Sequence, residues 1–153
     1  MGDPNRNKEF TKFILKQFPN INSVLIIGDG KGELACLLAE QNLKVRVIEI
    51  DPRFEGKNNL SVVYKKGLFT EDTEIEEDLV IGMHPDDATS EIILGAKKQN
   101  KSWAVVPCCI VGKYSSGVKS MKEWLQRLKS LDPPVEEYML HIGGQNIVLY
   151  KRR

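Results

Sequence analysis

Residues 23–51 constrain the fold more than any other part of the sequence. The apolar run at 24–27 is typical of a parallel strand that is buried on both faces. It leads directly into G-D-G-K-G at 28–32, where three glycines stand at alternate positions, and a leucine-rich helical pattern follows. A second β-rich run covers 45–51. Strand, glycine turn, helix and strand in this order predict a parallel βαβ unit.

The glycine turn and the acid after it predict a ligand site. Glycines let the backbone turn sharply and come close to a bound molecule, and the N–H groups of the following helix point at the same place. We therefore predict that Gly28, Asp29, Gly30 and Gly32 bind a ligand. Glu49 closes the second strand 21 residues after Gly28, where a carboxylate hydrogen-bonds the hydroxyls of a ribose. The alternative is a plain strand-to-helix turn beside a solvated strand end.

The glycine spacing separates two classes of nucleotide-binding protein. The dinucleotide pattern G-x-G-x-x-G requires a glycine at position 33, where this chain has Glu33. The observed pattern, G-x-G-x-G, resembles the first motif of the class I S-adenosylmethionine-dependent methyltransferases. That resemblance implies S-adenosylmethionine as the cofactor and adds Ile50, His84 and Pro107 to the expected cofactor-binding residues. The sequence departs from the family at Ile26, where these enzymes commonly carry an acid.

Length and composition set limits on the remaining possibilities. The 153 residues predict a single domain over 1–153, with no room for a separate substrate domain. No apolar run approaches the ~20 residues that span a membrane, and the N-terminus is polar, so we expect a cytoplasmic protein. The three cysteines have no zinc-type spacing, which predicts neither a disulfide framework nor a structural metal. A net charge of +1 gives no general attraction to nucleic acid.

The rest of the chain continues the alternation of helices and strands. A helix is predicted at 10–18, short polar connections at 51–59 and 69–77, strands at 60–64, 78–83 and 103–106, helices at 86–98 and 118–131, and a β-hairpin at 138–150. Together with the resemblance, these elements predict an α/β, Rossmann-like class I methyltransferase fold. Its sheet has seven strands, mostly parallel, and ends in an antiparallel C-terminal hairpin.

A second block, residues 78–114, resembles a narrower group, the tRNA 2′-O-methyltransferases and related RNA-modifying proteins. The resemblance rests on His84 after a strand, on Ala88-Thr89 at a helix start and on Pro107-Cys108-Cys109 after the next strand. Pro85-Asp86-Asp87 and Ser90 depart from that pattern. This resemblance implies RNA as the first expected methyl acceptor.

Both parts of this block follow central strands, at the edge where open α/β sheets bind ligands. His84 is the candidate general base, and a hydrogen-bonded strand-end histidine is the alternative. Asp86 and Asp87 fit the first turn of a helix, where acids complement the helix dipole. The expected acceptor-binding residues are the following: Pro85, Cys108, Cys109, Lys113 and Tyr114.

The predicted function is methyl transfer from S-adenosylmethionine to an unidentified acceptor. Two alternatives stay open. One is a non-catalytic module that keeps the fold for binding or as a scaffold, which Ile26 and the Pro85-Asp86-Asp87 segment favour. The other is an NAD-dependent oxidoreductase, which the glycine spacing disfavours. A partner subunit is also left open.

Overall fold

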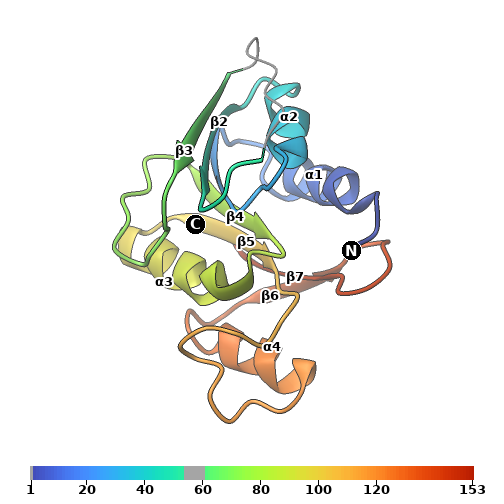
Figure 1. Ribbon diagram of the computed structural model, residues 1–153, viewed down its shortest axis with the longest axis vertical. Coiled ribbons are helices and arrows are strands. Elements are labelled where there is room, and N and C mark those ends of the chain that lie inside the picture. Colours follow the sequence, from blue (N-terminus) through green and yellow to red (C-terminus); the bar gives the residue numbers. More distant parts are fainter. Residues whose placement is uncertain (1, 54–60) are drawn as a thin grey trace.

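The computed structural model describes residues 2–53 and 61–153, and their strands form one twisted sheet with helices on both faces (Figure 1). Within these residues the sheet has seven strands in the order β3-β2-β1-β4-β5-β7-β6. Strands β1 to β5 are parallel to one another, β7 is antiparallel to β5, and β6 is antiparallel to β7. The bounds are β1 Ser23–Ile27, β2 Lys44–Glu49, β3 Val62–Lys66, β4 Leu79–Met83, β5 Ser102–Val106, β6 Glu136–Met139 and β7 Ile147–Lys151.

The predicted fold class is therefore confirmed, including the antiparallel C-terminal hairpin. The strand predicted at 60–64 lies at Val62–Lys66. Its first residue, Leu60, and most of the connection predicted at 51–59 lie outside the described residues.

The helices divide the core into two layers, one on each face of the sheet. Helices α1 (Arg6–Gln17) and α2 (Glu33–Ala39) pack on one face, and α3 (Thr89–Gln99) and α4 (Met121–Lys129) pack on the other (Figure 1). Because side chains alternate along a strand, β1 contributes to both layers. Val24 and Ile26 belong to the core under α1 and α2, and Leu25 and Ile27 to the core under α3 and α4.

Three predicted helices begin differently from expectation. The helix predicted at 10–18 is α1, which begins earlier, at Arg6. The helix predicted from residue 86 opens with a 3₁₀ turn, η1 (Asp86–Ala88), and α3 begins at Thr89. Asp86 has φ +52°, a left-handed conformation that cannot form part of a right-handed α-helix. The helix predicted at 118–131 begins at Met121, because the Ser120 side chain accepts a hydrogen bond from the Glu123 N–H and caps it.

The sheet topology brings the ends of four parallel strands to one edge. Gly28 follows β1, Glu49 closes β2, His84 follows β4 and Pro107 follows β5. Within the described residues we find no helix that combines the length and the apolar character needed to cross a membrane.

Candidate functional site

An open cavity of about 1100 Å³ lies at the carboxyl edge of the sheet. It is as large as the pockets that hold cofactors and drug-sized ligands. Two groups of residues flank it. We call the Gly28–Gly32 loop with Glu49 the glycine side, and residues 84–87 with residues 107–109 the histidine side. Of the residues predicted from sequence, the following line the cavity: Gly28, Asp29, Gly30, Glu49, Ile50, His84, Pro85 and Lys113.

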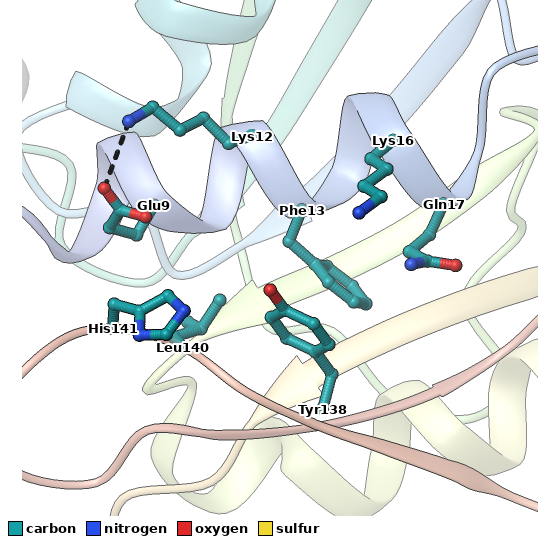
Figure 2. A pocket seen from close by; sticks show the side chains of 8 residues that line it. All are labelled: Glu9, Lys12, Phe13, Lys16, Gln17, Tyr138, Leu140 and His141. Atoms are coloured by element: carbon teal, nitrogen blue, oxygen red, sulfur yellow. Dashed lines mark hydrogen bonds and ion pairs between the residues drawn. The ribbon is translucent and has the colours of Figure 1, made fainter.

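A second hollow, between α1 and the end of β6, is too small for the same purpose. It measures about 140 Å³ and shares no lining residue with the larger cavity (Figure 2). The Phe13 and Tyr138 rings pack together in it, with centroids 5.1 Å apart. The larger cavity is therefore the candidate site.

The glycine turn has the backbone conformation that the sequence predicts. Gly28, Gly30 and Gly32 have φ of +76°, +57° and +84°, values that side-chain-bearing residues rarely adopt. The Gly28 N–H donates to the carbonyl oxygen of Ile48 at 3.0 Å, which ties the loop to the end of β2. Gly32 is buried and caps α2, and it does not line the cavity.

Glu49 joins the loop to the neighbouring strand. Its Oε2 accepts a hydrogen bond from the Gly30 N–H at 2.9 Å, and its Oε1 accepts one from the Asp51 N–H at 3.2 Å. A carboxylate has about four lone-pair positions, so capacity remains for two hydroxyl donors. The next side chain, Ile50, lines the cavity and is 58% exposed.

Asp29 lines the cavity, and its carboxylate also accepts hydrogen bonds from α2. Its two carboxylate oxygens accept hydrogen bonds from the Leu34 and Ala35 N–H groups, at 3.2 and 2.8 Å. Burial raises the pKa of Asp29 to about 7, although these two hydrogen bonds act in the opposite direction. The carboxylate thus satisfies N–H groups that the first turn of α2 would otherwise leave unpaired.

On the histidine side, a short turn positions His84 and Pro85. His84 has φ +52°, its N–H donates to the Val106 carbonyl at 3.0 Å, and its Nε2 lies 3.1 Å from the Gln145 carbonyl oxygen. A carbonyl only accepts, so we assign the ring proton to Nε2, which leaves Nδ1 as an acceptor. The conformation of Pro85 depends on Gly82, because a Cβ there would lie 2.7 Å from the Pro85 Cβ.

The Pro107-Cys108-Cys109 segment lies behind this turn. Pro107 is buried, and the three residues are not among those that line the cavity. The Cys108 Sγ donates to Asp86 Oδ1 at 3.1 Å and lies 3.4 Å from the Cys109 Sγ. Burial, together with the Asp86 carboxylate and Cys109, raises the pKa of the Cys108 thiol to about 12. As it stands, this thiol is a poor nucleophile.

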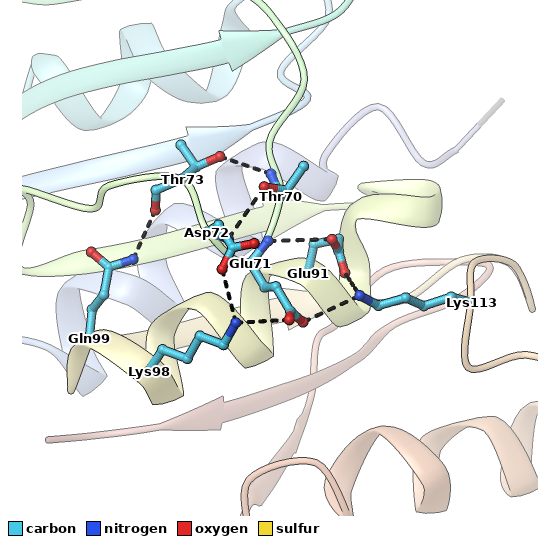
Figure 3. Close-up of polar contacts among 8 residues, drawn as sticks. All are labelled: Thr70, Glu71, Asp72, Thr73, Glu91, Lys98, Gln99 and Lys113. Carbon is cyan, nitrogen blue, oxygen red and sulfur yellow. Dashed lines mark hydrogen bonds and ion pairs between the residues drawn. The ribbon is translucent and has the colours of Figure 1, made fainter.

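Lys113 lines the cavity, but its ammonium group is paired with two carboxylates. Its Nζ lies 3.3 Å from Glu71 and 3.2 Å from Glu91 (Figure 3). Glu71 also pairs with Lys98, so the network links the segment before β4 to α3. Tyr114 does not line the cavity, and its ring lies 5.6 Å from the Lys113 Nζ.

Besides residues 67–70 after β3, sequence reasoning missed two parts of the cavity wall. The first is the N-terminal segment, because residues 2, 4, 6 and 7 line the cavity. Asn7, within α1, donates from Nδ2 to Glu33 at the start of α2. The second is Arg53, whose N–H donates to the Gly30 carbonyl at 3.2 Å. No periodicity or motif marks these residues, and only their nearness to the strand ends identifies them.

Comparison with protein-family models gave no match, and comparison with curated protein sequences gave none either. Solved structures do match. One is CalS10, an amino pentose methyltransferase from Micromonospora echinaspora solved with S-adenosylmethionine. It has a TM-score of 0.66 and 10% identity, over 97% of this chain and 91% of that chain.

Two further structures resemble the chain over part of their length. PigF, solved with S-adenosylhomocysteine, has a TM-score of 0.64 and 13% identity, over 95% of this chain and 55% of that one. Human N-acetylserotonin methyltransferase, solved with S-adenosylmethionine, has a TM-score of 0.65 and 13% identity, over 97% of this chain and 52% of that one. The chain thus spans about half the length of these two proteins. At such identities the likeness shows a shared fold, the Rossmann-like methyltransferase fold.

Proposed function

We propose that this chain is an S-adenosylmethionine-dependent methyltransferase, a single domain whose cofactor binds against the glycine side of the cavity. One observation carries the proposal. The Glu49 carboxylate, at the end of β2, already holds the Gly30 N–H at 2.9 Å inside a cavity of about 1100 Å³. Structures with the same fold were solved with S-adenosylmethionine or S-adenosylhomocysteine.

The residues of the cavity fit the chemical groups of this cofactor. Glu49 retains lone pairs for two ribose hydroxyls. Ile50 and Leu68, both lining the cavity, are 58% and 67% exposed, so they offer apolar surface that a flat base would cover. Gly28 and Gly30 add no side chain that would separate the loop backbone from the ligand.

Bound S-adenosylmethionine supplies a methyl group on a positively charged sulfur, and transfer requires the acceptor atom to lie in line with that bond. The protein's part is to orient the acceptor and to exclude water. Buried Met83 and Pro85 form the apolar wall beside His84. His84, held at Nε2 by the Gln145 carbonyl, accepts a proton at Nδ1 when the acceptor is a hydroxyl.

The charges around the cavity favour a small-molecule acceptor. Six acidic residues and four basic ones line it, and the ammonium of Lys113 is already paired with Glu71 and Glu91. An RNA site needs a surplus of positive charge to bind phosphates. RNA, the acceptor that the Pro-Cys-Cys resemblance implies, is therefore the alternative outcome of the labelling experiment described below.

Calorimetric titration of the full chain with S-adenosylmethionine, S-adenosylhomocysteine and NAD tests the cofactor. We expect the first two to bind and NAD not to bind. Glu49→Ala should weaken binding by about 1–3 kcal/mol, because buried hydrogen-bond partners are lost. Asp51→Ala is the matched control, since Asp51 is exposed and does not line the cavity. Absence of binding at millimolar S-adenosylmethionine would favour the scaffold alternative, and binding of NAD alone would favour the oxidoreductase.

Radiolabelled cofactor then identifies the acceptor class. The protein is incubated separately with a small-molecule extract, with total RNA and with RNA-free protein extract. We expect label in the small-molecule pool. Label confined to RNA would reject the small-molecule proposal and leave the methyltransferase assignment intact.

A further inference from the structure

The histidine side carries a cluster of three side chains of the kinds that can bind a metal, drawn from two segments. The cluster comprises Asp86, Cys108 and Cys109, whose ligand atoms all lie within 4.8 Å of one another. Asp86 comes from the turn after β4 and the cysteines from the segment after β5. Adjacent cysteines have no zinc-type spacing in the sequence, and the third group stands 22 residues before Cys108. Only the fold brings the three together.

We infer that Asp86, Cys108 and Cys109 form a site for a thiophilic divalent cation, Zn²⁺, at the rim of the cavity. Two sulfur atoms and one carboxylate oxygen are a zinc donor set, whereas Mg²⁺ and Ca²⁺ take oxygen ligands. The inference does not rest on the proposed function, because it concerns the binding of a cation and not the transfer of a methyl group.

The distances suit a tetrahedral ion after a small adjustment. Zinc–ligand bonds of about 2.3 Å to sulfur and 2.0–2.2 Å to oxygen place two sulfurs about 3.8 Å apart, and a sulfur and an oxygen about 3.6 Å apart, in a tetrahedral site. The two sulfurs are separated by 3.4 Å, and Cys108 Sγ lies 3.1 Å from Asp86 Oδ1. The third separation, between the Cys109 Sγ and the Asp86 carboxylate, is within 4.8 Å. Side-chain rotations that open the two short gaps by about 0.4–0.5 Å would admit the ion, which displaces the protons of both thiols.

The site would keep one coordination position open. Among the described residues no further His, Cys, Asp or Glu joins the cluster at this distance. Zinc sites with three protein ligands bind water or a substrate atom at the fourth position. Asp86 lines the cavity, so the open position would lie at its rim. Each thiol that binds loses its proton to solvent, and zinc uptake releases two protons per chain.

Metal titration of the reduced, metal-free full chain tests the inference. We expect one Zn²⁺ per chain, and Co²⁺ in its place should give the visible bands and thiolate charge-transfer absorption of a tetrahedral site. Cys108→Ser, Cys109→Ser and Asp86→Asn should each lower the affinity by at least 10–100-fold, the range found when outer partners of a site are lost. Circular dichroism confirms that each variant is folded.

Two neighbouring residues supply matched controls. Cys36→Ser removes the third thiol, on α2, and Asp87→Asn removes the adjacent carboxylate, and neither should change the affinity. Zinc should also protect two of the three thiols from alkylation while Cys36 still reacts. Absence of zinc uptake, or unchanged affinity in any of the three ligand variants, would overturn the site. A Cys108–Cys109 disulfide that persists after treatment with a reductant would also overturn the site.

Discussion

On the glycine side of the cavity backbone N–H groups donate the hydrogen bonds, whereas on the histidine side an imidazole and a thiol donate two of them. The glycine side is held by N–H groups that donate to Ile48 and to the Glu49 and Asp29 carboxylates. On the histidine side the His84 N–H and ring donate to the backbone carbonyls of Val106 and Gln145, and the Cys108 thiol donates to Asp86. Every residue except proline offers a backbone N–H, so the glycine side needs only its glycines and the Glu49 and Asp29 carboxylates, whereas the histidine side needs an imidazole and a thiol at given positions. The first kind suits a ligand common to many proteins, and the second suits a specific acceptor.

The largest expected effect tests the glycine side. Gly30→Val should abolish detectable S-adenosylmethionine binding at millimolar concentration, because a branched side chain at φ +57° is strained and intrudes beside the ligand. Gly117→Val is the control: Gly117 has φ +77°, no atom within 4 Å of an added Cβ, and no place in the cavity wall. Both variants should lose stability in denaturant unfolding, but only Gly30→Val should lose binding in calorimetry. Equal binding by the two variants would contradict the assignment of the loop.

The second prediction tests the histidine side. His84→Ala should lower turnover by roughly 10²–10⁴-fold while cofactor affinity stays nearly unchanged, because the acceptor's proton then has no base. The other histidine, His141, is exposed and does not line the cavity, so His141→Ala should behave like the wild type. Turnover is measured with the acceptor that labelling identifies. A parallel loss of turnover and cofactor affinity would make His84 a structural residue and remove the distinction between the two sides.

The third prediction asks whether the histidine side also depends on a glycine beneath it. In Gly82→Ala the new Cβ would lie 2.7 Å from the Pro85 Cβ and 2.9 Å from the Ile92 Cδ1. Overpacking of this kind costs about 1–3 kcal/mol of unfolding free energy. Gly67→Ala is the control, because no atom lies within 4 Å of an added Cβ there. If the two variants unfold at the same denaturant concentration, the turn at Pro85 does not depend on Gly82.

The glycine side could be predicted from the sequence because its determinants form one recognisable motif within a βαβ unit. A buried apolar strand, alternate glycines and an acid 21 residues later are all visible as a pattern. The rule that parallel strands end at one edge then brings Glu49 to the loop. The sequence pattern and the family resemblance also predicted a mostly parallel, seven-stranded sheet with an antiparallel C-terminal hairpin, which the structure confirms.

The partners on the histidine side could not be predicted in this way. Cys108 meets Asp86 across 22 residues of sequence, and His84 meets Gln145 across 61. Both His84 and Asp86 adopt positive φ without being glycine, and no pattern in a single sequence marks such positions. The sequence predicted Lys113 at the acceptor but did not predict its ion pairs with Glu71 and Glu91. That network forms only when the segment before β4 packs on α3.

The smallest expected effect tests whether the glycine side carries an electrostatic cost as well. The pKa of Asp29 is about 7 in the folded chain, above its value of about 3.9 when unfolded. Between these values the folded state holds the extra proton, so the contribution of Asp29 to stability falls as pH rises from about 4 to 7.

Asp29→Asn cannot ionise and still offers one oxygen to the helix. The unfolding free energy of the wild type minus that of Asp29→Asn should therefore be greater at pH 5 than at pH 8. Because the side chain is only half-buried, we expect a difference of about 1.4 kcal/mol, the equivalent of one pKa unit. Taking the difference at each pH removes the contributions of Glu77 and Asp132, whose lowered pKa values favour stability at higher pH. An equal difference at both pH values would mean that water solvates the Asp29 carboxylate. The glycine side would then be held by hydrogen bonds without an electrostatic cost.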